Sequence, residues 1–298
     1  MKTNFLFFIL FGFIFILLIR PAIIAPGPNY HLWDLNEILK DPSVNITLIS
    51  QIINNNYDSC LCGLEYPDVT IFEYYTNFKV YAQMHNYNVV DEMLRVARND
   101  RDRSFAYCYK IHLATDGASH NFFVPQAIKS TLLPNYIIHG PKELAQESRF
   151  LNPVSQHMME NHQEFDWLVT QATGRDWSSE AEKLNIIIGG GNFYSQAYAP
   201  ETQTFWGKSQ NILYKTVGLF VSAESTVDLE KLSIEESKAV LRGETPSLNP
   251  SGEEALAAAD AETKVWLYLV TFLILVVIFF LSFRWRIIGF SKEPFKIR

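Results

Sequence analysis

The sequence predicts an all-α fold with a membrane helix at each end. Apolar residues recur at helical spacing through the central part of the chain, and no alternating run is long enough for a useful strand. Two apolar runs lie near the termini. Phe5 to Ile24 is interrupted only by Arg20 and Pro21, and Val265 to Phe283 is 19 residues without a charge. About 20 apolar residues span a bilayer as a helix.

Charge is distributed as unevenly as hydropathy. The 298 residues are 48% hydrophobic and 19% charged, which excludes a disordered chain. The formal net charge is −7, but residues 25–263 hold 17 basic and 31 acidic residues, a net of −14. This acidity argues against a protein that coats nucleic acid, because such proteins present basic surfaces to phosphates.

These patterns divide the chain into five parts. They are an N-terminal membrane anchor or signal sequence (1–25), an extracytoplasmic α-helical domain (26–243), a linker (244–263), a transmembrane helix (264–284) and a basic cytoplasmic tail (285–298). The basic tail places the C-terminus in the cytoplasm of a membrane-bound protein. Residues 1–25 read either as a cleaved signal peptide or as an uncleaved anchor, and the poor cleavage site around Ala25 favours the anchor.

The central part predicts a series of helices. Pro26 to Pro28 form a stiff connector, and a loop is expected from Gly63 to Asp68. The stretch from Phe72 to Asn99 reads as one long helix or two. The other expected helices cover residues 32–39, 44–53, 104–121, 141–150, 163–172, 180–187, 209–222, 228–242 and 253–262.

Three cysteines give no even disulfide framework. A bridge from Cys108 to either Cys60 or Cys62 is compatible with an oxidising compartment, and the lone Cys-x-Cys is a weak zinc signal. His157 and His162, five residues apart, read as surface groups or as groups behind a ligand. The run of three glycines that begins at Gly189 reads as a flexible break.

Residues 68–143 hold a pattern of metal-ligand side chains. His112, Asp116 and His120 follow one another at i, i+4 and i+8, which places them along one helix face. His139 and Glu143 repeat the i, i+4 pair. His85 and Asp68, which follows Pro67, complete the set.

Imidazole nitrogens and carboxylate oxygens together suit Zn²⁺ better than Mn²⁺ or Fe²⁺. Seven candidate ligands exceed the three or four that one zinc ion takes, so the sequence predicts two or three zinc ions. Neighbouring metal ions of this kind clamp a phosphoryl group and activate water at neutral pH.

The pattern resembles the zinc-dependent phospholipase C family, whose fold is shared by single-strand nucleases of the S1/P1 type. The family order is Asp, His, His-x3-Asp, His and His-x3-Glu. The matching residues here are Asp68, His85, His112, Asp116, His120, His139 and Glu143. Gly63 to Asp68 and Phe105 to Tyr107 also resemble the family, and the resemblance covers about residues 30–150.

The resemblance implies a role for each of these residues. Asp68, His85, His112 and Asp116 would hold one zinc ion, and His120, His139 and Glu143 a second. A third would use Asp116 as a bridge together with His31. In the family the amino terminus of a Trp completes this third shell, but here no Trp precedes His31. Water or Asp34 would take its place.

We therefore expect phosphodiester hydrolysis of the phospholipase C type, with Asp68 as the catalytic base and a membrane phospholipid as anchor and candidate substrate. The acidic domain favours a zwitterionic head group over nucleic acid, although a nuclease stays an alternative. A third reading is non-enzymatic. In it, structural metal ions stabilise a subunit of a larger membrane or envelope complex.

Overall fold

The computed structural model describes residues 28–71, 73–131, 150, 157–189 and 223–290 of the chain. These residues contain helices and no strand, which confirms the all-α prediction. The longer helices are α2 (Pro28–Lys40), α3 (Leu48–Asn55), α4 (Tyr57–Glu65), α6 (Phe78–Met84), α7 (Tyr87–Val96), α8 (Asp100–Ala118), α9 (Val124–Thr131), α11 (Asp166–Thr173), α12 (Ser178–Gly189), α15 (Ala223–Leu241) and α16 (Glu253–Phe290). Short helical segments are η1 (Tyr66–Thr70), α5 (Glu73–Thr76), η2 (Ser119–Phe123) and η4 (His162–Glu164).

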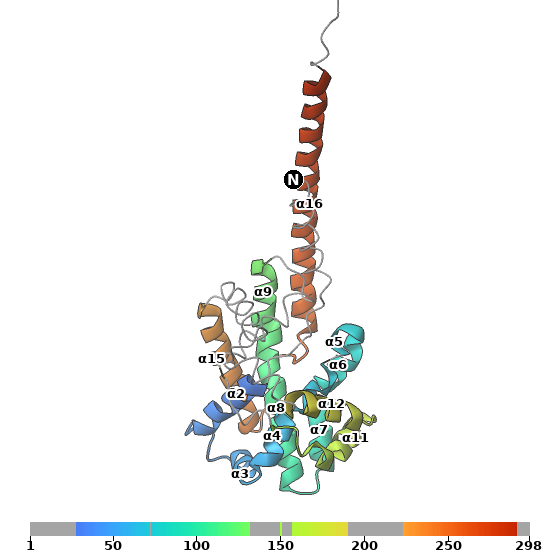
Figure 1. Ribbon diagram of the computed structural model, residues 1–298. Coiled ribbons are helices and arrows are strands. Elements are labelled where there is room, and N and C mark those ends of the chain that lie inside the picture. The colour runs from blue at the N-terminus through green and yellow to red at the C-terminus, as the bar shows by residue number, and fades with distance from the viewer. Residues whose placement is uncertain (1–27, 72, 132–149, 151–156, 190–222, 291–298) are drawn as a thin grey trace, which may run out of the picture.

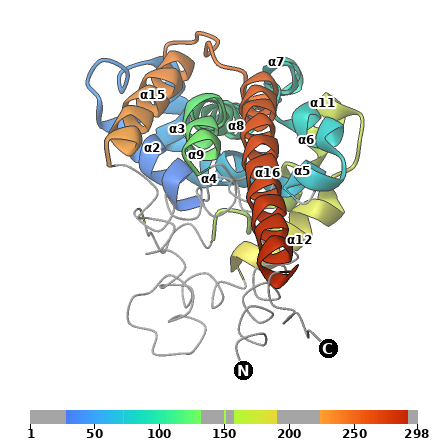
Figure 2. The ribbon, with the colours of Figure 1, turned by 90° about the horizontal axis from the view of Figure 1, so that it is seen from above.

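Helix α8 runs through the middle of the bundle, with the other helices arranged around it (Figures 1 and 2). It starts at a cap in which the Asn99 side chain accepts a hydrogen bond from the Asp102 amide. From Phe105 onward nearly every side chain is buried, on all faces of the helix. Because this buried helix carries Lys110, His112 and Asp116, polar groups occupy the centre of the molecule.

A π-helical turn, η2, continues α8 into α9. Val124 donates its amide hydrogen to the carbonyl of Ser119, five residues earlier. Pro125 follows at once and has no amide hydrogen of its own. A proline ring clashes with the carbonyl four residues before it in a regular α-helix, so the wider turn accommodates it.

Between residues 57 and 99 the helices differ from the prediction. The expected loop from Gly63 to Asp68 is helical, because Pro67 sits in the first turn of η1, where a missing amide hydrogen costs nothing. The stretch 72–99 forms three helices rather than one or two, and the breaks fall at Asn77 and at His85–Asn86. Gly63 is required for close packing, since a Cβ there would lie 2.1 Å from the Phe105 carbonyl oxygen.

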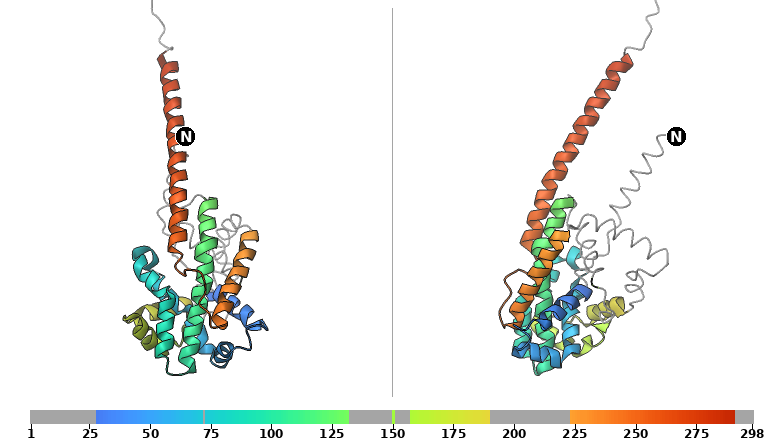
Figure 3. Two further views of the ribbon diagram at one scale, coloured as in Figure 1. Left: turned by 180° about the vertical axis from the view of Figure 1, so that it is seen from behind. Right: turned by 90° about the vertical axis from the view of Figure 1, so that its left-hand side faces the viewer.

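The segment 244–252 is partly buried: Pro246, Pro250, Ser251 and Gly252 are buried, whereas its first two residues are exposed. Helix α16 begins at Glu253, as the predicted polar helix over 253–262 requires, so the second half of the predicted linker 244–263 is helical. Its first turns bury Leu256 and Ala259 beside α9. Farther along, α16 extends away from the bundle (Figures 1 and 3), and large apolar side chains such as Trp266, Tyr268 and Phe272 are exposed.

Within the described residues, no helix combines the length and the apolar character needed to cross a membrane. The transmembrane helix predicted over 264–284 is part of α16 and is not supported as a membrane span. The predicted anchor over 1–25, the tail from 291 on, and the helices expected over 141–149 and 209–222 lie outside the described residues.

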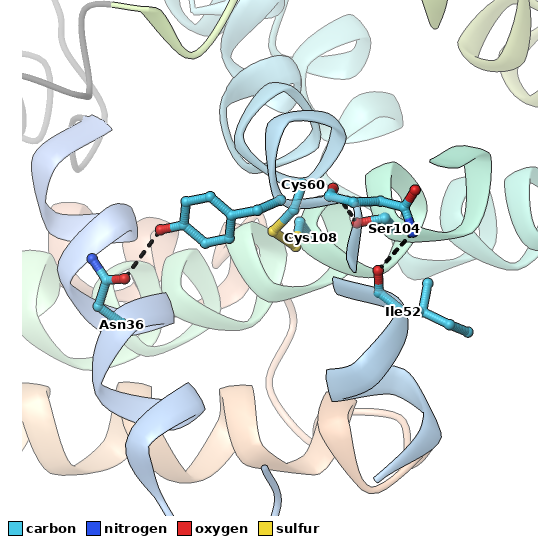
Figure 4. The surroundings of a disulfide bond; sticks show 7 residues. Asn36, Ile52, Cys60, Ser104 and Cys108 are labelled. Carbon is cyan, nitrogen blue, oxygen red and sulfur yellow. Dashed lines mark hydrogen bonds between the residues drawn. A yellow bond between two sulfur atoms is a disulfide. The ribbon is translucent and has the colours of Figure 1, made fainter. Parts of the chain in front are cut away.

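A disulfide between Cys60 and Cys108 ties α4 to α8 (Figure 4). Cys62, the other partner that the sequence allows, is buried and free. A hydrogen bond supports the same junction, because Ser104 donates to the Asn56 carbonyl at 2.9 Å. A second bond joins α4 to α2: Tyr57 donates to the side chain of Asn36 at 3.0 Å. The bridge therefore secures the core of the bundle to its central helix.

Removing this disulfide should destabilise the protein strongly. It closes a loop of 48 residues, for which the chain-entropy model gives about 4 kcal/mol. The double substitution Cys60→Ala/Cys108→Ala should lower the free energy of unfolding, measured by urea denaturation, by about that amount. Cys62→Ala is the control, because it also deletes a buried sulfur but keeps the bridge. An equal loss in both variants would contradict the assignment.

A buried carboxylate joins α2, α8 and α15. Asp34 Oδ2 accepts from Ser237 at 2.5 Å and lies 3.0 Å from the Thr115 hydroxyl, while Oδ1 accepts from Ser233 at 2.9 Å. Burial raises the pKa of Asp34 to about 6, against the lowering effect of these three hydroxyl groups. Both carboxylate oxygens of Asp34 thus accept hydrogen bonds from hydroxyl groups. This argues against Asp34 as a ligand of the third zinc ion.

Asp34 should make stability depend on pH. Its pKa of about 6 in the folded protein exceeds its usual 3.8, so the folded state binds the proton more tightly than the unfolded state does. The stability that this protonated group contributes is fully present below pH 3.8, decreases as pH rises from 3.8 to 6, and is lost above pH 6, a total change of about 3 kcal/mol. The test measures the free energy of unfolding by urea, with chelator present, at a series of pH values. The difference in this free energy between wild type and Asp34→Asn should show the decline. A pH-independent difference would contradict it.

Candidate metal centre

Four predicted ligands meet in the centre of the bundle. Asp68, His85, His112 and Asp116, here called the four-residue cluster, each offer one ligand atom, and these atoms lie within 4.8 Å of one another. All four side chains are buried. They come from η1, the end of α6, and two successive turns of α8. The spacing of His112 and Asp116 by four residues places both on the same side of α8, as predicted.

The cluster has Asp116 at its middle. The Nε2 atoms of His85 and His112 each lie 3.2 Å from Asp116 Oδ2, and Asp68 Oδ1 lies 3.9 and 3.7 Å from the same two nitrogens. Among the described residues, the two Nε2 atoms and both oxygens of Asp116 have no hydrogen-bond partner. Such buried polar atoms are costly unless something pairs with them, and a cation placed among them would do so.

Backbone carbonyls orient the imidazole rings. His112 Nδ1 donates to the carbonyl of Leu64 at 2.7 Å, and His85 Nδ1 donates to the carbonyl of Tyr81 at 3.1 Å. The proton on Nδ1 leaves the lone pair on Nε2, the atom that faces the cluster. A metal-binding histidine is usually held in this way, through its second ring nitrogen.

His31 lies beside the cluster. It sits on α2 and is fully buried, so it is not a surface residue at a helix start. Its Nε2 is 3.6 Å from Asp116 Oδ1, the carboxylate oxygen turned away from His85 and His112. Its ring stacks on that of His112, with 4.0 Å between ring centres. Asp116 therefore has histidines near both of its oxygens, which is the arrangement a bridging carboxylate needs.

His120 is also buried and lies on η2, one turn beyond Asp116. Its Nδ1 donates to the carbonyl of Pro250 at 2.8 Å, so its ring is oriented as those of His85 and His112 are. Its charge acts on Asp116, which places it near the cluster. The remaining predicted ligands, His139 and Glu143, lie outside the described residues.

The electrostatics of the cluster favour ionised Asp116. Burial alone raises its pKa, but the charges of His112 and His120, and the close nitrogens of His112 and His85, outweigh this and hold the pKa well below its usual range. Burial lowers the pKa of His85. Burial also acts to lower the pKa of His112, but Asp116 and Asp68 raise it above its usual value. A bound metal ion would displace that proton from His112.

Two further described histidines, His157 and His162, do not join the cluster. His157 is exposed and bonds to Glu160. His162 is buried, which excludes the first of the two expected alternatives, a surface residue. Its two ring nitrogens contact Asp166 and Glu182 at 3.2 and 3.0 Å. Tyr66 donates to the same Asp166 oxygen at 2.7 Å. This network joins η1, η4, α11 and α12, and so has a structural role.

Three features of the site were not predicted from the sequence. They are the orienting carbonyls of Leu64, Tyr81 and Pro250, which are backbone groups without a side-chain signature. The Pro250 contact joins residues 130 apart in the chain. Only its neighbour Gly252, a glycine directly before a helix, carries a signal that such a close approach exists.

No protein-family model, no curated protein and no solved structure matches the chain. The site is therefore described by its own geometry.

The four-residue cluster should bind a divalent metal ion and gain stability from it. Free metal at 1,000 times its dissociation constant adds about 4 kcal/mol to a folded protein that alone binds it. We expect Asp116→Asn to remove most of the bound metal and of the thermal shift, because it takes away the central carboxylate. Metal content and thermal unfolding check this. His157→Ala, at an exposed histidine, is the control, and the same metal content in both variants would contradict the assignment.

Proposed function

We propose that the protein is a zinc-dependent phosphodiester hydrolase of the phospholipase C type. The observation that carries the proposal is the buried four-residue cluster, whose two Nε2 atoms and central carboxylate converge without hydrogen-bond partners among the described residues. Two imidazoles and two carboxylates are a donor set that suits Zn²⁺. When bound, zinc would supply a Lewis acid and lower the pKa of water.

The roles of the residues follow from their positions. His85 and His112 would hold zinc through Nε2, each ring being fixed by a backbone carbonyl. Asp116 would bridge to a further ion near His31 through its other oxygen. Asp68 is the other carboxylate of the four-residue cluster, beside Asp116. We therefore assign it the role of general base, which accepts the proton of the attacking water. His120, His139 and Glu143 would form a second zinc position.

A structural metal site is the competing function. The burial of all four cluster side chains favours it, because structural zinc sites have four protein ligands and no open position. His31 and His120 favour the enzyme, since they are buried next to a cluster that already has four ligands. In the structural reading the domain would be a subunit of a membrane complex.

We also propose that the domain lies outside the cytoplasm at a cell membrane. The Cys60–Cys108 bridge supports an oxidising compartment. The exposed Trp266, Tyr268 and Phe272 of α16 support contact between this part of the chain and apolar surroundings. A phospholipid substrate fits that location.

Substrate turnover with purified full-length protein tests the proposal. Phosphatidylcholine vesicles, single-stranded DNA and a chromogenic phosphodiester would each be assayed with zinc and with chelator. We expect hydrolysis of phosphatidylcholine that chelator abolishes. Zinc bound without turnover of any substrate would favour the structural site, and turnover of DNA alone would favour a nuclease.

Asp68→Asn should lower the rate of hydrolysis by about 100-fold or more, because a positioned general base contributes 10²–10⁴-fold. The matched control is Asp176→Asn, the same change at an exposed aspartate whose side chain accepts a hydrogen bond from the Ser178 amide. Zinc content is measured in parallel to separate lost chemistry from lost metal. A rate within threefold of the control would remove Asp68 from this role.

A further inference from the structure

The segment from Ser247 to Gly252, here called the 247–252 loop, lies in the chain between α15 and α16. It packs against the central helix α8 and the π turn η2 that follows it. Asn121 donates to the Asn249 carbonyl at 2.7 Å and to the Gly117 carbonyl at the same distance. A Cβ at Gly117 would lie 3.0 Å from Leu248 Cβ, so the loop and the helix are in direct contact. The contact covers the point at which α8 passes into the π turn η2.

Within this contact the loop holds His120 in two ways. The Pro250 carbonyl accepts from His120 Nδ1 at 2.8 Å, which fixes the ring. Gly252 lies against the backbone of the same residue: a Cβ there would be 2.4 Å from His120 Cβ and 2.6 Å from its carbonyl oxygen. Gly252 also has a φ of 57°, which side chains disfavour. Glycine is the residue type that fits both the close approach to His120 and this positive φ.

Glu236 on α15 fixes the other side of the loop. One of its oxygens accepts from the Ser247 hydroxyl at 2.6 Å, and the other accepts from the amides of Ser247 and Leu248 at 2.6 and 3.2 Å. Both carboxylate oxygens are thus used to hold one end of the loop. At its other end, Gly252 leads directly into α16, whose Leu256 amide donates to the Gly252 carbonyl at 2.9 Å.

We propose that the 247–252 loop is the positioning element of His120, and that it thereby sets the metal affinity of the zinc position that His120 serves. This rests on the proposed function, which assigns His120 to a second zinc position. Pro250 and Gly252 are positioning residues, because they touch His120 and not the metal ion. The four-residue cluster has no residue on this loop.

The main experiment compares Gly252→Ala with Gly174→Ala in the full-length chain. Gly174 has a φ of 72° and nothing within 4 Å of a Cβ, so its substitution has the same backbone cost without the contact to His120. Zinc equivalents per chain and zinc affinity are measured by competition with a chromogenic chelator. We expect Gly252→Ala to weaken the second equivalent at least tenfold and leave the first unchanged, and Gly174→Ala to leave both unchanged. Equal zinc binding by the two variants overturns the proposal.

Glu236→Gln is the milder test, and it serves if Gly252→Ala does not fold. It weakens the charged hydrogen bonds to the loop without touching His120, and we expect a three- to tenfold weaker second equivalent. Wild-type affinity in this variant overturns the positioning role when Gly252→Ala cannot be measured.

His120→Ala separates this proposal from the proposed function. If it leaves two zinc equivalents in place, the second zinc position itself is wrongly assigned, and both proposals fail at that point. If it removes the second equivalent while Gly252→Ala and Glu236→Gln bind zinc as wild type does, only the role of the loop fails.

Discussion

The structure depends on one constraint: its central helix is buried on every side and yet carries charged and polar groups. An ionised Asp116 in the middle of a helix bundle is costly unless cationic or hydrogen-bonding groups surround it. The surrounding elements supply these groups. Helices α2 and α6 bring His31 and His85 to the carboxylate, and α8 itself brings His112. The packing of α2 and α6 around α8 is therefore also the assembly of the site, and a change that separates these helices disturbs both.

The rings around Asp116 are held mainly by the backbone. The carbonyls of Leu64, Tyr81 and Pro250 each accept from one histidine Nδ1. Because a carbonyl belongs to every residue, the orientation of these rings depends on where helices end and cross, rather than on particular side chains. The Cys60–Cys108 bridge lies one helical turn before both Leu64 on α4 and His112 on α8, so it secures the crossing that sets the shortest of the three distances.

The sequence predicted the helical class, several helices and the shared face of His112 and Asp116, because helix periodicity and i, i+4 spacing are local patterns. Asp68 and His85 were assigned to the same metal ion only through the resemblance to the phospholipase C family. It did not predict the helix through Gly63 to Asp68, since Pro67 signals a loop unless it stands in a first turn. It left Cys60 and Cys62 equal as partners of Cys108, because only the packing of α4 on α8 decides which sulfur faces the bridge. The contact between the 247–252 loop and His120 joins distant parts of the chain through backbone atoms, which no residue pattern records.

The position of the disulfide in the sequence has a consequence for the unfolded chain. Asp68 and His85 lie inside the 48-residue loop that it closes, and His112 and Asp116 follow Cys108 within eight residues. An oxidised chain therefore keeps all four ligands tethered near one point even without its helices, at a raised effective concentration. Metal ions would then bind the oxidised unfolded state more tightly than the reduced one. Because binding to the unfolded state reduces the stability that a ligand confers, metal ions protect the reduced protein from unfolding more than the oxidised protein.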